Sequence, residues 1–447
     1  MQTIIINACY EKIKKTLHDS YDLLSDEGCL FAIVRTEYDN NYNVVHDFFQ
    51  VINEAINIGY DYINTIVYPS SFYQNTFIID NVKYIVWLAK NRKKMKFNKD
   101  AIREKHIWKD IEWGKREKNY NPKGKDPGNV WIPTEDDGHA NITNHIILDD
   151  EGVIKRILDM SDCGSDFILI NEPTVYNNTP PSLDKAHQTD SNLTINDLFS
   201  RVYFKSSENM DDIEDETIKV VVTSPPYWNL KNYFKEGQIG QESYDLYLER
   251  IKKVWSQCYK KLTPDGSLWI NINIRMHNSK VILIPYDIIK ICKEIGFYYK
   301  GILIWHKSSG IPTNDKNLVD RHEYILAFTK NYDVNLNCDI MSSFSDYKND
   351  IINGKAFWNI NRKAGSIGKK YIHPAIYPNE LVTRIVKMAS NPGDIILDPF
   401  LGSGTSLIAS VQLGRNFIGY EYYEGFQPLM ESRFKVEIPN TKVDYII

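Results

Sequence analysis

The most restrictive feature of this 447-residue sequence is a glycine-rich segment directly after a short apolar run. Ile395, Ile396 and Leu397 are typical of a buried strand, and the segment Asp398–Ser406 (DPFLGSGTS) leads into a predicted helix over Thr405–Leu413. A strand that turns through glycines into a helix is characteristic of open α/β sheets. In such sheets ligands bind outside the carboxyl ends of the strands, so this segment predicts a ligand site.

The glycine segment has the features of a nucleoside pocket. Gly402 and Gly404 allow a ligand to approach the backbone closely, and the start of the helix offers unpaired N–H groups. The next predicted strand ends at Glu421, where an acid can bind ribose hydroxyls. A dinucleotide fingerprint would need a third glycine at Leu407, so a mononucleoside cofactor fits better than a nicotinamide. A plain glycine turn is the alternative.

A second segment, Thr223–Trp228 (TSPPYW), also follows an apolar run, Val220–Val222. Two consecutive prolines remove two N–H donors and hold the backbone extended, so the neighbouring carbonyl groups can face outward as acceptors. A flat amine, such as the exocyclic amine of a nucleobase, could stack on Tyr227 and donate to Ser224. The alternative is a strand-end turn with two packed aromatic rings.

The second half of the chain alternates strands and helices. Beside the strands that precede the two segments, strands are predicted over 267–274, 299–307 and 322–330, and helices over 244–262, 281–297 and 379–390. Strands separated by helices of this length predict an α/β fold with a doubly wound, mostly parallel sheet.

Composition narrows the class of protein further. No apolar run reaches membrane-spanning length and no signal peptide is recognisable, so a soluble cytoplasmic protein is expected. The six cysteines show neither a CxxC pair nor a zinc-type spacing with histidine, which predicts reduced thiols and no metal site. The net charge of −5 indicates that any nucleic-acid surface must be a local patch.

Four motifs in this order resemble the motif set of DNA amino-methyltransferases that use S-adenosylmethionine. They are TSPPYW, WHKSSGIP at Trp305–Pro312, HPAIYP at His373–Pro378 and DPFLGSGTS. The catalytic motif precedes the cofactor motif, as in the permuted, beta-type members, and the resemblance covers about Leu193 to Phe434. It implies a Rossmann-like methyltransferase fold, S-adenosylmethionine as cofactor, double-stranded DNA as partner and a restriction-modification role with a possible cognate endonuclease.

The resemblance also implies roles for individual residues. The catalytic motif comprises Ser224, Pro225, Pro226 and Tyr227; the cofactor-binding residues are Asp398, Phe400, Gly402, Gly404, Thr405, Ser406, Glu421, His373 and Pro374. Among relatives, a leading serine in the tetrapeptide accompanies cytosine-N4 methylation, and adenine-N6 or RNA methylation are the alternatives. Carbon-5 methylation needs a thiolate within a Pro-Cys pair, which is absent. A DNA-binding pseudoenzyme is the alternative from another class, against which the intact motifs argue.

The first half resembles the second without its motifs. Tyr10–Ile33 matches Leu248–Ile270, Lys83–Asn91 matches Glu323–Asn331, and the correspondence keeps its order over five segments. No SPPY precedes the first match, and no glycine motif follows Leu169. We therefore expect a degenerate methyltransferase-like copy over residues 1–170, a linker over 171–192 and a catalytic domain over 193–447, as a monomer with an internal pseudo-dimer or as a homodimer.

Two basic clusters are candidate DNA contacts. Between Lys90 and Lys125 there are 14 Lys or Arg against 5 Asp or Glu, interleaved with aromatic residues. The candidate phosphate contacts are Lys93, Lys94 and Lys96 in this region and Arg362, Lys363, Lys369 and Lys370 just before His373. A solvated surface is the alternative for both clusters.

Overall fold

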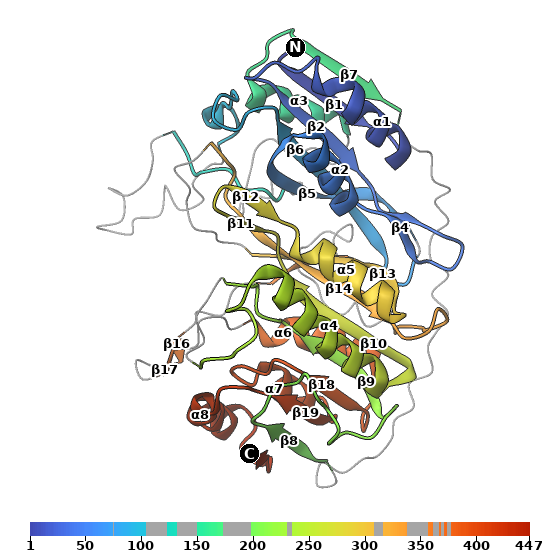
Figure 1. Ribbon diagram of the computed structural model, residues 1–447, viewed down its shortest axis with the longest axis vertical. Helices are drawn as coiled ribbons and strands as arrows, with labels where there is room; N and C mark the ends of the chain where they lie inside the picture. Colours follow the sequence, from blue (N-terminus) through green and yellow to red (C-terminus); the bar gives the residue numbers. More distant parts are fainter. Residues whose placement is uncertain are drawn as a thin grey trace, which may run out of the picture.

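A computed structural model describes residues 1–74, 76–103, 123–131, 150–172, 198–229, 235–307, 316–337, 356–360, 366–367, 371–372 and 377–447. Two large sheets follow one another along the long axis, the first half of the chain above and the second half below in Figure 1. In the described part of the chain, no helix is both long and apolar enough to cross a membrane.

The second half forms a nine-stranded sheet. Its order is β15 (Phe357–Asn359), β13 (Tyr298–His306), β14 (His322–Thr329), β10 (Leu262–Ile272), β9 (Ile218–Thr223), β18 (Ile395–Asp398), β19 (Asn416–Tyr420), β8 (Ser200–Tyr203) and β20 (Asp444–Ile446). Neighbouring strands are parallel except that β14 runs antiparallel to both β10 and β13. The sheet is therefore mostly parallel, as predicted, and β15, β8 and β20 extend it beyond the predicted strands.

Helices cover both faces of this sheet. They are α4 (Tyr244–Lys261), α5 (Ile284–Ile295), α6 (Asn379–Ala389), α7 (Thr405–Gln412) and α8 (Gln427–Glu437). Helix α4 buries Tyr247, Ile251, Val254 and Cys258, which recur every three or four residues and face the core. Helix α5 begins three residues later than predicted, because 280–282 form β12, paired with β11 (Arg275–His277), and a proline occupies the first helical turn.

The first half forms a five-stranded sheet of order β5 (Asp61–Gln74), β6 (Asp80–Ala89), β2 (Cys29–Val34), β1 (Thr3–Asn7) and β7 (Phe167–Asn171). Helices α1 (Tyr10–Tyr21), α2 (Phe48–Ile58) and α3 (Asp150–Ser161) belong to it. Both the order and the strand directions repeat those of β13, β14, β10, β9 and β18. Two of its four pairings are antiparallel, so the prediction of a mostly parallel sheet is wrong for this half.

The likeness of the halves extends to side chains. Gly59 and Gly296 end α2 and α5 at φ +118° and +117°, a left-handed conformation that favours glycine. Tyr21 lies against Gly59 as Tyr259 lies against Gly296. The two halves thus share a strand order and the details of one helix end.

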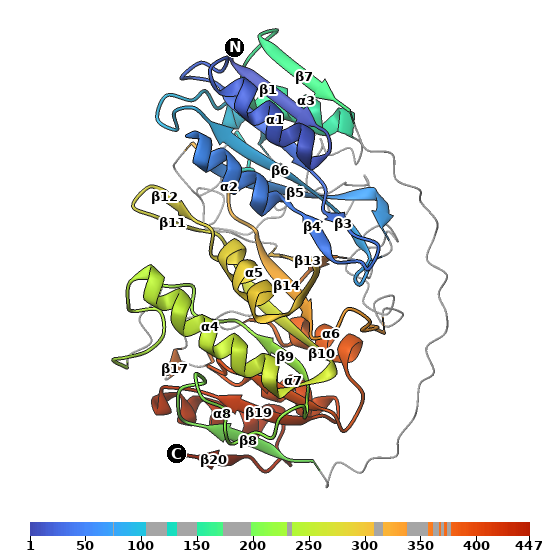
Figure 2. The same ribbon diagram turned by 45° about the vertical axis from the view of Figure 1, so that its right-hand side comes forward.

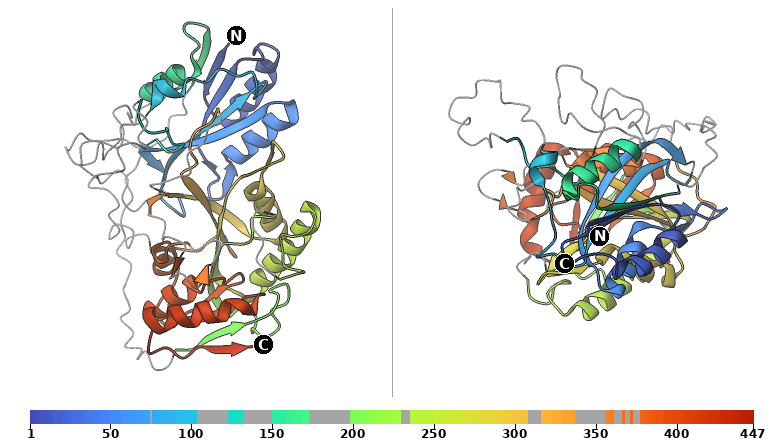
Figure 3. Two further views of the ribbon diagram at one scale, coloured as in Figure 1. Left: turned by 90° about the vertical axis from the view of Figure 1, so that its left-hand side faces the viewer. Right: turned by 90° about the horizontal axis from the view of Figure 1, so that it is seen from above.

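The two halves pack through equivalent positions. The amide of Ala356 donates to the carbonyl of Ile79, and the amide of Asn129 donates to the carbonyl of Val319, each at 3.0 Å. By strand register Ile79 corresponds to Val319, and Asn129 to Ala356. Such reciprocal contacts are the signature of a two-fold interface. Helices α1, α2, α5 and α4 form one continuous row beside the two sheets, and other helices lie on the opposite face (Figures 2 and 3).

Candidate active site

The carboxyl ends of β9 and β18 bring the two predicted motifs together. These strands are neighbours and run parallel, with Val221 opposite Leu397. The hydroxyl of Thr223, one residue before Ser224, donates to a carboxylate oxygen of Asp398 at 2.6 Å. The SPPY segment and the glycine segment therefore begin side by side at one edge of the sheet.

Asp398 lies inside the protein and is fully engaged by neighbours. Its carboxylate also accepts from the Ser406 hydroxyl at 2.5 Å, the Phe400 amide at 3.0 Å and the Tyr377 hydroxyl at 3.3 Å. Burial raises the pKa of this carboxyl group, although each of these hydrogen bonds favours the charged form. Asp398 therefore joins β9, the glycine loop and the segment before α6 at the carboxyl edge of the sheet.

The glycine loop folds against Glu421. Gly402 and Gly404 have φ values of +56° and +81°, and the Gly402 amide donates to Glu421 at 2.8 Å. The other carboxylate oxygen of Glu421 accepts from the Tyr423 amide at 2.8 Å. Each oxygen retains a further lone pair, which suits a carboxylate that receives ribose hydroxyls. Burial raises the pKa of Glu421 to about 7.

A buried arginine supports the loop from below. Arg433 of α8 donates through one guanidinium nitrogen to the carbonyl of Ser403 at 2.9 Å and to the hydroxyl of Thr405 at 2.8 Å. Thr405 and Ser406 are buried at the start of α7, where they hold the loop in place. The left-handed glycines, the helix start and Glu421 form a cradle that fits a nucleoside with a charged tail.

The SPPY segment presents one half-buried serine and two half-buried rings. Pro225 and Pro226 are buried, whereas Ser224, Tyr227 and Trp228 are half-buried. Trp228 has φ +36°, an uncommon conformation for a bulky residue and typical of functional loops. Two further groups hold this segment. The Tyr247 hydroxyl donates to the carbonyl of Pro226 at 2.8 Å, and the Arg275 guanidinium donates to the backbone carbonyls of residues 227–229.

Three polar side chains converge behind Tyr227. Its hydroxyl donates to Glu323 at 2.8 Å, and the amide nitrogen of Asn271 donates to the same carboxylate oxygen at 2.8 Å and to the tyrosine oxygen at 3.0 Å. The ammonium of Lys307, 3% exposed, lies 2.9 Å from the other oxygen of Glu323. Burial alone would raise the pKa of Glu323, but the neighbouring Lys307 ammonium helps to hold that pKa below its usual value.

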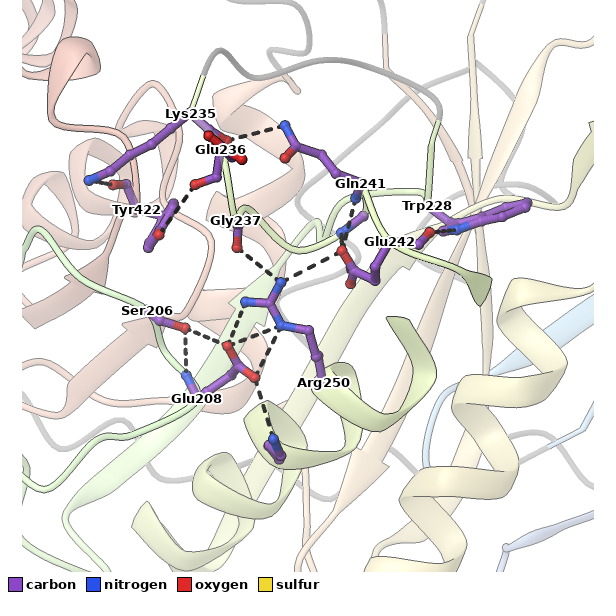
Figure 4. Close-up of polar contacts among 12 residues, drawn as sticks. Ser206, Glu208, Trp228, Lys235, Glu236, Gly237, Gln241, Glu242, Arg250 and Tyr422 are labelled. Carbon is purple, nitrogen blue, oxygen red and sulfur yellow. Dashed lines mark hydrogen bonds and ion pairs between the residues drawn. The ribbon is translucent and has the colours of Figure 1, made fainter. Parts of the chain in front are cut away.

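An arginine of α4 fixes the segment that follows the SPPY loop (Figure 4). Arg250 forms a bidentate pair with Glu208, 2.7 Å at its shortest, and donates to the carbonyl of Gly237 at 3.0 Å. Glu242 in turn accepts from the Trp228 indole through its backbone carbonyl at 2.8 Å. The ammonium of Lys235 donates to the carbonyl of Tyr422 at 2.9 Å. Residues 235–242 thus connect the SPPY loop to the loop after Glu421.

Sequence reasoning missed the residues behind the motifs: Asn271, Glu323, Lys307, Arg275, Arg250 and Tyr377. A polar residue in an otherwise apolar strand was the available signal for Asn271 and Glu323. Six predicted residues lie outside the described residues, namely His373, Pro374, Arg362, Lys363, Lys369 and Lys370. Among the described residues, no group of three or more His, Cys, Asp or Glu side chains could hold a metal ion.

The first basic cluster lies beside the segment that leads into β14. Lys316, in the segment that leads into β14, donates to the carbonyl of Met95 at 2.9 Å. Lys93 is exposed and has no ion-pair partner in the described ranges, whereas Lys94 pairs with Asp26 at 2.6 Å and Lys96 with Glu27 at 3.2 Å. Among the described residues, therefore, only Lys93 of the three offers an ammonium without a local carboxylate.

The equivalent edge of the first sheet carries a different set of residues. Strand register aligns Asn7 with Ser224, Leu169 with Asp398, and Lys83 with Glu323. Lys83 forms an ion pair with Asp150. The carboxylate of Asp150 also accepts from the Tyr68 hydroxyl at 3.1 Å and from the side-chain amide of Asn7 at 3.0 Å. A closed cluster of internal hydrogen bonds occupies this edge, where the second half has its two motifs.

Comparison with known proteins agrees with the site. A family model described as DNA methylase, of the N6/N4 methyltransferases, matches residues 4–169 and 218–432. The type II methyltransferase M.MthZI of Methanothermobacter thermautotrophicus is 32% identical over 281 residues, 52% of this chain and 76% of that protein. M.Cfr9I of Citrobacter freundii is 27% identical over 303 residues, 60% of this chain and 97% of that protein.

Two solved structures are also similar. A protein of Thermus thermophilus, solved with S-adenosyl-L-methionine, is 27% identical with a TM-score of 0.43, covering 56% of this chain and all of that one. The PvuII DNA methyltransferase (cytosine-N4-specific) is 20% identical with a TM-score of 0.45, covering 55% of this chain and 89% of that one. Both TM-scores are low, so the assignment rests on the sequence matches: this chain belongs to the N6/N4 family of DNA methylases.

Proposed function

We propose that this chain transfers a methyl group from S-adenosylmethionine to the exocyclic N4 amine of a cytosine extruded from double-stranded DNA. The observation that carries the proposal is the hydrogen bond between Thr223 and Asp398, which puts the SPPY segment next to the glycine loop. Gly402, Gly404 and Glu421 would hold the donor, and Ser224 and Tyr227 would receive the base. When bound, the donor supplies a methyl group on a sulfonium, which needs no nucleophilic side chain.

The residues of the site mainly orient the reactants. An exocyclic amine shares its lone pair with the ring and is a poor nucleophile. Hydrogen bonds to the Ser224 side chain and to an adjacent backbone carbonyl draw the amine toward tetrahedral geometry, which localises the lone pair on nitrogen. Alignment of the amine with the methyl group should supply most of the rate.

Cytosine-N4 is the preferred target because the tetrapeptide begins with serine, with adenine-N6 as the alternative. Mass spectrometry of nucleosides from DNA treated with the enzyme and labelled donor decides between them. Labelled N4-methylcytosine supports the proposal. Labelled N6-methyladenine would show that the target base is adenine and that the mechanism is the same. Absence of either methylated base from a protein that binds donor and DNA would refute the enzymatic function.

Substitutions in the SPPY segment separate catalysis from donor binding. Tyr227→Ala should remove base stacking worth about 1–3 kcal/mol and abolish most turnover. Ser224→Ala should have a similar effect on turnover. Because neither side chain belongs to the glycine cradle, donor affinity by calorimetry should stay at the wild-type value in both variants.

For the first half we propose a degenerate copy that lacks chemistry and acts in DNA recognition or scaffolding. The repeated strand order supports a common origin, and the Lys83–Asp150 cluster fills the edge where a site would be. The reciprocal contacts support an internal pseudo-dimer. They occupy the surface through which the second half would otherwise pair, so the chain should be monomeric.

The biological setting proposed is modification within a restriction system. M.MthZI and M.Cfr9I are both named type II methyltransferases, which supports this setting. A cognate endonuclease with the same target would then be the functional partner. Methylated DNA that resists cleavage by that endonuclease is the corresponding assay.

A further inference from the structure

The proposed reaction leaves a proton to be removed from the methylated nitrogen, and the cluster behind Tyr227 offers a place for it. On the basis of the proposed function, we infer that Glu323 is the terminal proton acceptor and that the proton reaches it through the hydroxyl groups of Ser224 and Tyr227. The N–CH3 bond forms while the S–CH3 bond breaks. The nitrogen then loses one proton, and the carboxylate of Glu323 gains one.

The geometry defines an ordered relay. The Ser224 hydroxyl, which would accept from the amine, lies 3.5 Å from the Tyr227 oxygen, and that oxygen lies 2.8 Å from Glu323. The first distance is long for a hydrogen bond, as expected of a site without substrate, since such contacts tighten in the reacting complex. Each hydroxyl passes on its own proton as it receives one, so both end unchanged.

The surroundings keep Glu323 ready to accept. A phenol, an amide NH2 and an ammonium all donate to its carboxylate, which holds it in the charged form. A nitrogen that carries both a methyl group and a positive charge next to an aromatic ring is far more acidic than any carboxylic acid. A carboxylate with a low proton affinity therefore suffices, and its 17% exposure lets water take the proton afterwards.

The amide of Asn271 fixes the orientation of this carboxylate. Its nitrogen serves both Glu323 and Tyr227, while its oxygen is buried with no hydrogen-bond partner among the described residues. Through this nitrogen the amide donates to the carboxylate and favours the charged form of Glu323. We propose no chemistry for the first half, and there the residue that corresponds to Glu323 by strand register is Lys83.

The test is the pH dependence of single-turnover methylation by the full chain. At pH 7 the Glu323→Gln variant should be about 100-fold slower or more, the usual effect of losing a general base. Its rate should then rise with pH up to tenfold per unit, because hydroxide takes over the proton. A loss of rate that does not depend on pH would show a purely structural role for Glu323 and overturn the inference. An unchanged rate would overturn it as well.

A second variant keeps the test valid if Glu323→Gln does not fold. Lys307→Met removes the cation that lowers the pKa of Glu323, so the rate should fall with decreasing pH within a range where wild type is flat. A flat profile for Lys307→Met would contradict the relay. Calorimetry should show wild-type donor and DNA affinities for both variants, and weakened binding would instead assign Glu323 to the binding site.

The matched control is Glu216→Gln, which removes another lysine-paired carboxylate, 2.9 Å from Lys330. It should leave the rate and its pH profile unchanged. The wild-type arm separates this inference from the proposed function. A wild-type enzyme that yields no N-methylated base refutes the function, whereas normal wild-type turnover with an unaffected Glu323→Gln variant refutes only the proton route.

Discussion

The ring of Phe48, in the first half, lies 5.3 Å from the ring of Tyr324, in the second. Both rings are fully buried and belong to one apolar core that continues across the boundary between the halves. The Tyr299 hydroxyl also donates to Asp47 across this boundary at 3.2 Å. The halves are therefore joined by a buried surface as well as by the chain.

The shared core predicts cooperative unfolding. Phe48→Ala should cost about 3–5 kcal/mol and should lower the stability of both halves in a single transition, because the cavity lies between them. Urea denaturation followed separately by tryptophan fluorescence and far-UV circular dichroism measures this. Two resolved transitions, with only the first shifted, would contradict it. A fragment over 193–447 should accordingly be poorly stable.

Donor binding should depend on pH through Glu421, whose pKa is raised to about 7. Ribose hydroxyls donate to the charged carboxylate, so affinity should be full above pH 7 and should weaken up to tenfold per unit as pH falls below it. Calorimetry from pH 5.5 to 8.5 measures the trend, and Glu421→Gln should flatten it. A constant affinity for wild type would count against the ribose role.

The same residue should affect stability in the opposite direction. Its folded pKa of about 7 lies above the ordinary value of 4.5, so the cost of burying the charge is present above pH 7 and disappears as pH falls. Without donor, Glu421→Gln should therefore exceed wild type in stability at pH 8, by up to about 3 kcal/mol, and match it near pH 4.5. Thermal unfolding at both pH values gives the comparison.

Gly404 should be more sensitive than other left-handed glycines. It has φ +81°, and a Cβ atom there would lie 2.6 Å from the ring of Phe434. Gly404→Ala therefore combines backbone strain with a steric clash and should cost more than about 2 kcal/mol as well as weakening donor binding. Gly164→Ala is the matched control, with φ +56° and no atom within 4 Å. Equal losses of stability in both variants would show that the clash is relieved.

Arg250 should affect turnover through the segment 235–242. Arg250→Met leaves Glu208, whose side chain is 20% exposed, without its bidentate partner, and frees the carbonyl of Gly237. We expect a loss of about 1–3 kcal/mol in stability and a lower kcat from a misplaced Trp228. Lys252→Met, on the same helix with its ammonium exposed, should change neither. A fully active Arg250→Met enzyme would show that the segment does not position the SPPY loop.

The basic cluster should contribute to DNA affinity mainly through Lys93. Lys93→Gln should reduce the slope of log affinity against log salt by about one unit, because one phosphate contact is lost. Lys94→Gln and Lys96→Gln should change it less, since Asp26 and Glu27 already pair with these ammonium groups. Filter binding at several salt concentrations measures the slopes, and Lys14→Gln serves as a control outside the cluster. Unchanged slopes for all variants would identify a solvated surface.

The sequence by itself determined the local features of this protein. Apolar runs and helical periodicity predicted the central strands and helices of the second half, because burial imposes these patterns on neighbouring residues. The Gly402 and Gly404 turn was predictable for a different local reason, since a positive φ restricts the residue type at each position. Alignment of the chain with itself predicted the repeat. The short strands at 200–203 and 444–446, at one end of the sheet, carry too few residues to show alternation.

Only the tertiary structure decided which side chains meet. Asn271, Lys307 and Glu323 come from three strand regions, and the register between those strands determines that they converge behind Tyr227. The sequence predicts Asp398 as a cofactor-pocket residue, and the structure adds its hydrogen bonds to Thr223, Ser406 and Tyr377. Hydrogen bonding between distant strands has no local pattern in the sequence, so these contacts follow from the assembled sheet alone.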